Sequence, residues 1–125
     1  MVPDFTKSEK RFVRQVANLA WDRLLRKSLV RIASALGRMD AGTATAFDVD
    51  DAIHKYHAGP SRQLHNEFST NKPWHSVCNA YIDGILTDDD FVDAPDGIRK
   101  ELAQIFSIHC KINGIDPATL ANADG

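Results

Sequence analysis

The sequence predicts an all-α protein, a single-domain helical bundle of five or six helices with one long helix near the N-terminus. No segment alternates polar and apolar residues with the two-residue period of a strand. Several segments instead place apolar residues three and four positions apart, as the buried stripe of a helix requires. The stretch from Lys7 to Met39 also contains no proline, and its first glycine is Gly37.

The long N-terminal stretch begins with a capping-box pattern and carries an apolar face that changes sides. In a capping box, Thr6 and Glu9 each hydrogen-bond to the backbone amide of the other. At about 100° per residue, the apolar residues of the two halves fall on nearly opposite arcs. The first arc holds Phe12, Val13, Val16, Leu19 and Ala20, and the second holds Trp21, Leu25, Leu29, Ile32, Leu36 and Met39. A heptad drifts only about 20° on an ideal helix, so drift does not produce this change.

Two explanations fit the change of face. The helix breaks near residues 20–24, with Asp22 as a new N-cap, or it stays straight and its two ends pack on different partners. A straight run would be about 50 Å long, which exceeds the diameter of a compact domain of this size. We favour the straight or slightly bent helix, with a second copy of the chain as one partner. A further alternative is that the first half of this stretch is a mobile arm that docks only on a partner.

Capping residues, glycines and prolines divide the rest of the chain into shorter helices. Thr45 begins a capping box, Gly59 suits a C-terminal cap, and Pro60 suits the first turn of a new helix. The compact helical body then covers 40–116, and residues 117–125 form a tail. We expect helices over about 47–58, 60–69, 73–83 and 96–112, with brief helical turns at 87–92 and 116–120. In the first of these helices, the spacing places Ile53 on a buried stripe.

Charge is distributed unevenly along an otherwise ordinary composition. The chain is 43% hydrophobic and 26% charged, with a formal net charge of −2, which disfavours a general nucleic-acid binder. Residues 1–39 contain nine Lys/Arg and three Asp/Glu, whereas residues 40–125 contain six and fourteen. Either the two parts attract each other within the fold or across a dimer, or the first part is a basic arm for an acidic partner.

The remaining global features predict a cytoplasmic protein without a membrane partner. Cys78 and Cys110 do not form a Cys-x-x-Cys pattern, and isolated thiols of this kind are usually reduced and buried. No apolar run approaches the length of a membrane span. The first residues also lack the apolar centre of a signal peptide.

No enzymatic signature is present, so we expect no catalytic residues and no cofactor. The chain has no nucleophile elbow, phosphate-binding loop or dinucleotide glycine pattern. Histidines and cysteines could converge on a zinc ion, but their spacing matches no established zinc motif, and we expect no metal site. These residues are His54, His57, His65, His75, Cys78, His109 and Cys110. The acidic cluster Asp88–Asp90 lacks the ligand order of a calcium loop, and its alternative role is to dock a basic helix.

Two surfaces are the candidates for binding a partner. One is the first helix, and the other is a polar corner around Gly59–Pro60 that is rich in the Tyr, Arg and His-like side chains of protein interfaces. The candidate residues are Phe12, Val16, Leu19, Arg23, Lys27 and Arg31 on the first helix, and His54, Tyr56, His57, Arg62 and His65 at the corner.

We therefore expect a non-enzymatic protein–protein interaction or regulatory module, self-associating as a homodimer through the N-terminal helix or binding another protein. One alternative is a nucleic-acid-associated protein that uses the basic N-terminal helix. The division of its basic residues between opposite arcs disfavours this role, because nucleic-acid binders gather them on one stripe. The second alternative is a metal-dependent enzyme that uses the His/Cys cluster.

Overall fold

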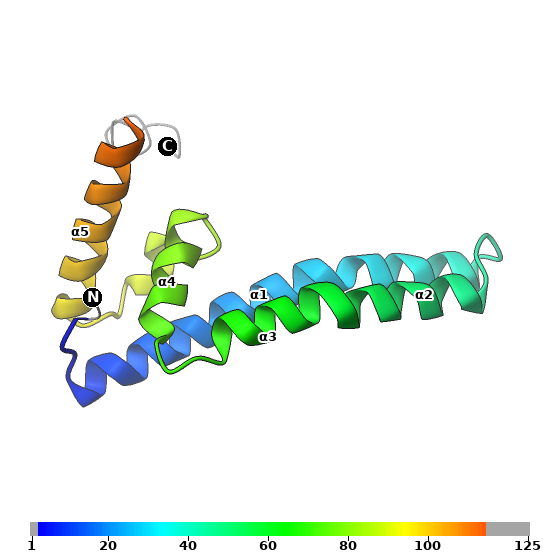
Figure 1. Cartoon of the computed structure of the whole chain (residues 1–125), viewed down its shortest axis with the longest axis horizontal. Coiled ribbons are helices and arrows are strands. Elements are labelled where there is room, and N and C mark those ends of the chain that lie inside the picture. Colours follow the sequence, from blue (N-terminus) through cyan, green and yellow to red (C-terminus); the bar gives the residue numbers. More distant parts are fainter. Residues whose placement is uncertain (1–2, 115–125) are drawn as a thin grey trace.

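A computed structural model describes residues 3–114 of the chain, and these residues are helical without any strand (Figure 1). The all-α prediction is therefore confirmed for this part of the chain. The helices are α1 (Lys7–Asp40), α2 (Ala46–Tyr56), α3 (Arg62–Phe68), α4 (Pro73–Ile82) and α5 (Asp96–Asn113), with a π-helical turn η1 (His57–Ser61) and a 3-10 turn η2 (Asp88–Phe91). The turn expected at 116–120 lies outside the described residues.

Helix α1 runs without a break from Lys7 to Asp40. Its capping box is formed as predicted: the Thr6 amide donates to Glu9 Oε1 at 2.8 Å, and the Glu9 amide donates to Thr6 Oγ1 at 3.2 Å. Asp22 does not begin a second helix, because it lies within α1 and accepts a hydrogen bond from Arg26 Nε at 2.7 Å one turn later. The helix is therefore continuous, and the break considered near residues 20–24 does not occur.

After a short turn the chain returns along α1 as one helical run made of α2, η1 and α3 (Figure 1). The predicted helix boundary at Gly59–Pro60 is wrong. Proline lacks an amide hydrogen and crowds the preceding turn of an α-helix, and here the wider π-helical turn accommodates it. Gly59 does not adopt a positive φ, so it does not act as a left-handed cap. Because α2, η1 and α3 form one uninterrupted run, the described residues form four main helical segments. The predicted count of five or six helices is not confirmed.

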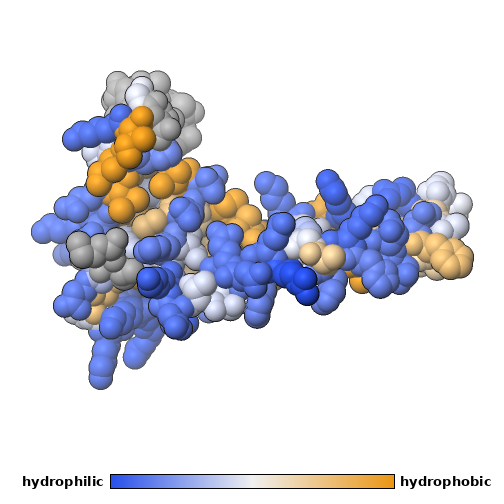
Figure 2. All heavy atoms as spheres, in the orientation of Figure 1, coloured by the Kyte–Doolittle hydropathy of each residue, from blue (hydrophilic) through white to orange (hydrophobic). Residues whose placement is uncertain are grey.

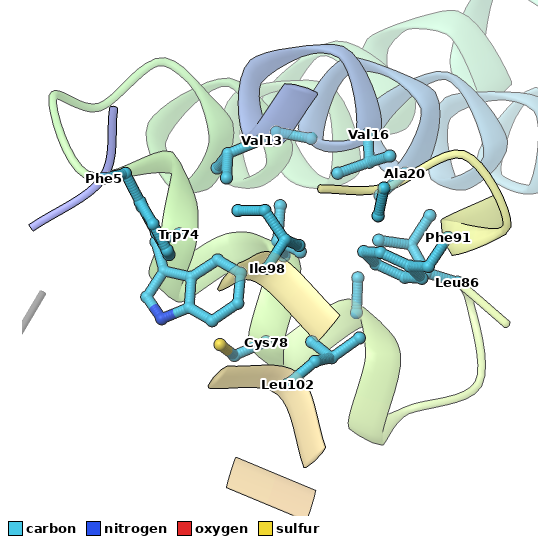
Figure 3. Packing of buried hydrophobic residues seen from close by; sticks show 14 of the residues in the cluster. Phe5, Val13, Val16, Ala20, Trp74, Cys78, Leu86, Phe91, Ile98 and Leu102 are labelled. Atoms are coloured by element: carbon cyan, nitrogen blue, oxygen red, sulfur yellow. The ribbon is translucent and has the colours of Figure 1, made fainter. Parts of the chain in front are cut away.

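The hydrophobic core lies where α4, η2 and α5 pack on the N-terminal half of α1 (Figure 3). Val77 and Ile98 are completely buried, and Val13 is 2% exposed. The Phe5 ring meets the Trp74 ring edge to face, with centroids 5.0 Å apart. The first apolar arc of α1, apart from Leu19 at its edge, is therefore covered by its own chain.

The second apolar arc of α1 packs instead against the returning run of α2 and α3. The indole of Trp21 stacks on the Phe68 ring at 6.0 Å with an interplanar angle of 10°, and Ala35 is 1% exposed farther along. The change of face on α1 thus has a structural cause, because each half packs against a different part of the same chain. The result is a long helical hairpin that projects from the core (Figures 1 and 2).

An ion pair and a hydrogen bond join η2 and the loop before it to α1. Arg23 donates from both terminal nitrogens to the two carboxylate oxygens of Asp90 at 2.7 Å, and its Nη1 also donates to the Ile85 carbonyl at 2.8 Å. Asp90 further accepts from the Thr87 amide at 2.8 Å. At this point the basic first part of the sequence meets the acidic second part within one chain.

Candidate interaction surface

The projecting part of the hairpin has an apolar side, which we define by Leu25, Leu29, Ala33, Leu36 and Ile53. On an ideal helix, Leu25 lies at the edge of the arc that faces α2, and Leu29, Ala33 and Leu36 lie beyond this edge on the same flank. Ile53 of α2 lies on the corresponding flank of the antiparallel helix. Leu29, Leu36 and Ile53 are 39%, 43% and 45% exposed, respectively. Large aliphatic side chains are thus left half covered along one side of the hairpin.

This exposure follows from the number of helices in the hairpin. The α1 residues that face the returning run form a seam in which successive members lie alternately four and three positions apart. They are Trp21, Leu25, Ser28, Ile32, Ala35 and Met39. The apolar arc of α1 is wider than this seam, and one neighbouring helix covers only part of it. A third or fourth helix on the apolar side would complete the coverage, as in a four-helix bundle.

The opposite side of the hairpin holds a groove of about 700 Å³ that apolar residues such as Val30 and Ile32 line together with charged ones; we call it the charged groove. Arg31 and Arg38 of α1 line it together with Asp48, Asp51 and Lys55 of α2. Lys55 Nζ lies 2.9 Å from an Asp51 carboxylate oxygen. Hydrogen bonds from Thr45, first from its backbone amide, lower the pKa of Asp48, and the charge of Arg38 adds a smaller contribution. Charges of both signs are interspersed on this side, so the two sides of the hairpin differ in character.

The structure distributes the candidate residues of the first helix over different environments. Val16 is 5% exposed in the core, and Phe12 packs its ring 6.0 Å from that of Phe91. Arg23 is engaged with Asp90. Leu19 is 36% exposed, Lys27 is exposed, and Arg31 lines the charged groove. The structure therefore does not gather these six residues into one exposed surface.

The five candidate residues around Gly59–Pro60 are not brought together either. His54 Nε2 lies 3.4 Å from an Asp50 carboxylate oxygen, and the His65 ring lies 6.0 Å from that of Trp21. Tyr56 lines the charged groove, and His57 and Arg62 are exposed. Because the run from α2 to α3 is continuous, the expected corner does not exist, and these side chains are spread over about three helical turns.

Pairing of the two hairpin helices was missed in the sequence, although signals for it were present. The second arc of α1 was recognised, but Ile53 was assigned to a buried stripe of a separate helix. The loop between Asp40 and Ala46 is short, and short loops join antiparallel neighbours. Combined with the seam of spacing four and three, this loop indicates a helical hairpin.

The two cysteines lie in buried positions, and burial keeps the Cys78 thiol protonated. Cys78 and Cys110 are free and buried. Burial, with a smaller contribution from the charge of Glu101, raises the pKa of the Cys78 thiol to about 12, so the reactive thiolate is scarce at neutral pH. Within residues 3–114, no group of three or more His, Cys, Asp or Glu side chains is placed to hold a metal ion.

Comparison with known proteins identifies no relative. The chain matches no protein-family model, no curated protein sequence and no solved structure. Over the part of the chain that the structure describes, no helix combines the length and the apolar character needed to cross a bilayer.

Proposed function

We propose that the protein is a non-enzymatic interaction module that self-associates through the apolar side of its hairpin. The observation that carries the proposal is the half exposure of Leu29, Leu36 and Ile53 along one side of a projecting pair of helices. The opposite side carries five charged side chains along its groove, so burial against a partner is more favourable on the apolar side. A second hairpin supplies the two helices that would complete a four-helix bundle.

A second copy of the chain is the occupant that the dimensions favour. The projecting part of α1, about residues 24–40, is roughly 25 Å long, and two adjacent helices are about 20 Å wide. A face of about 500 Å² is smaller than the roughly 800 Å² per partner of a standard interface. Two identical faces related by a twofold axis match each other in size, length and apolar character. The match between the two faces thus favours a second copy, and the small area limits the dimer to weak association.

The energetics support reversible association. Complete burial of a Leu or Ile side chain contributes about 1.5–3 kcal/mol, so covering the exposed part of each contributes about 1 kcal/mol. Three side chains per copy contribute about 6 kcal/mol in the dimer before the entropic cost of association is subtracted, so the dimer dissociates on dilution. We therefore expect monomer and dimer to exchange with protein concentration.

Sedimentation velocity or light scattering after gel filtration tests the proposal, with full-length protein from about 5 to about 500 µM. We expect the measured mass to rise toward twice that of the monomer. The double variant Leu29→Glu/Leu36→Glu should remain monomeric, because two carboxylates per copy would be buried at the interface.

The matched control is Val30→Glu/Phe47→Glu, which introduces the same charge at apolar residues that are 61% and 85% exposed and lie off the apolar side. This variant should dimerise like the original chain. A mass that stays monomeric over the whole range, or a dimer that survives Leu29→Glu/Leu36→Glu, would contradict the proposal.

A further inference from the structure

A stripe of four cations occupies the first two turns of α1, which we call the basic stripe: Lys7, Lys10, Arg11 and Arg14. Their spacing of three, four and seven residues places them on one face of the helix. All four are exposed, whereas Val13 and Val16 of the same turns are buried in the core. Figure 2 shows hydrophilic side chains projecting at this end of the molecule. The core thus fixes the helix and holds the four cations outward.

None of these four side chains has a hydrogen bond or ion pair with another described residue. Three other arginines of α1 have such partners: Arg23 binds Asp90, Arg26 binds Asp22, and Arg38 donates to Ser34. The one acidic residue within the span of the stripe, Glu9, is engaged in the capping box with Thr6. Positive charge is therefore concentrated along about 10 Å of helix.

The chemistry of the basic stripe favours a ligand recognised through charge alone. Protein interfaces place aromatic and aliphatic side chains at their centre, and the stripe has neither. An amphipathic helix on a membrane inserts its apolar face, but here that face is covered by the core. A nucleic-acid strand offers one phosphate per 3.4 Å of duplex axis, so about three phosphates of one strand match the length of the stripe.

We propose that the basic stripe binds the phosphate backbone of nucleic acid without reading its sequence. The proposal is independent of dimerisation, because the stripe and the apolar side of the hairpin share no residue. In the sequence, the basic residues seemed divided between opposite arcs. In the structure, Arg23 is paired with Asp90 within the fold, whereas the four N-terminal cations form a continuous stripe.

Fluorescence anisotropy with a labelled DNA duplex of about 24 base pairs tests the proposal at about 50 to 200 mM NaCl. About three phosphate contacts predict a slope of log K against log salt of about −2.7, so the affinity should fall about 40-fold over this range. Replacing Lys7, Lys10, Arg11 and Arg14 with Gln should weaken binding at least about tenfold at low salt and flatten the slope.

The matched control replaces Arg26, Lys27, Arg31 and Arg38 with Gln, which lowers the net charge by the same amount. This control should keep most of the affinity. Circular dichroism establishes that both variants retain their helicity. Absence of binding at low salt, or an equal loss in both variants, would overturn the proposal. So would binding of polyglutamate as tight as that of DNA, which would indicate an acidic protein as the partner.

Discussion

The ion pair between Arg23 and Asp90 joins two segments that are far apart in the sequence. Asp90 has a side chain that is 10% exposed, and Arg23 supplies both of its charge-assisted hydrogen bonds from α1. The hydrogen bonds from Arg23, more than those from Thr87, lower the pKa of Asp90. A carboxylate that is held ionised in this way depends on its partner.

We predict that Arg23→Gln lowers the free energy of unfolding by about 1–2 kcal/mol, because the carboxylate of Asp90 loses its charged partner. The partial exposure of Arg23 keeps the loss below that of a fully buried pair. Urea denaturation at pH 7 measures the change, and Lys27→Gln is a control that removes one exposed charge from the same helix. A loss equal to that of the control would contradict the prediction.

The pH dependence of this contact has a definite sign. Because the pKa of Asp90 is lower in the folded protein, its stabilising contribution is present above the ordinary Asp pKa of about 4. The contribution is lost as the pH falls through the lowered pKa. The difference in stability between the original chain and Arg23→Gln should therefore shrink in acid.

The helical run from α2 to α3 shows how a helix can contain a proline without ending. Pro60 lies within the π-helical turn η1, and the helix continues on both sides of it. In an α-helical interior, proline removes a hydrogen bond and clashes with the preceding turn, at a cost of about 3 kcal/mol. The wider turn separates the ring from the backbone that it would otherwise crowd.

We predict that Pro60→Ala changes the free energy of unfolding by less than about 1 kcal/mol, because the π-helical turn already accommodates the proline. By contrast, Asn66→Pro should destabilise the protein by about 3 kcal/mol, because residue 66 is exposed but it and its preceding turn lie within regular α3. Urea denaturation and circular dichroism measure both variants. Stabilisation of several kcal/mol by Pro60→Ala would show instead that the native turn is strained.

Local sequence rules succeeded where the structure depends on neighbouring residues. The capping boxes predicted at Thr6 and Thr45 both form. At Gly59–Pro60 the same rules failed. The chain there is supported by packing along α1, which local rules do not contain.

The candidate site was only partly predictable for a similar reason. Helical spacing identified the two arcs of α1, including Leu29 and Leu36. It did not indicate which helix covers each arc, because that depends on contacts between residues distant in sequence. Val16 was therefore assigned to a partner surface although α4 and α5 bury it, and Ile53 was assigned to the interior although it is 45% exposed.

The molecule as a whole combines a core with a projecting hairpin, and the two parts differ in how completely their side chains are buried. Trp74, Val77 and Ile98 are at most 3% exposed at the core, whereas Val49 is the one residue of α2 that is buried. Segments with few buried apolar contacts open at a lower free energy than the core. The hairpin is therefore expected to be the less stable part of the monomer.

We predict that backbone amides of α2 exchange hydrogen faster than those of α4 at low protein concentration, because fewer buried contacts hold α2 in place. Dimerisation would cover the apolar side, so raising the concentration should slow exchange in α2 and leave α4 unchanged. Hydrogen–deuterium exchange with mass spectrometry measures both. Equal protection of α2 and α4 in the dilute protein would contradict the prediction.

The continuity of α1 has a consequence for how far this protein can reach. Only the beginning of α1 is needed by the core, and the remainder meets its neighbour through a repeating pattern of seven residues. Adding one such repeat to α1 and one to α2 would extend the arm by about 10 Å, with the inward positions still in register. The distance between the base and the tip can thus vary in evolution or by engineering while the globular end keeps its packing.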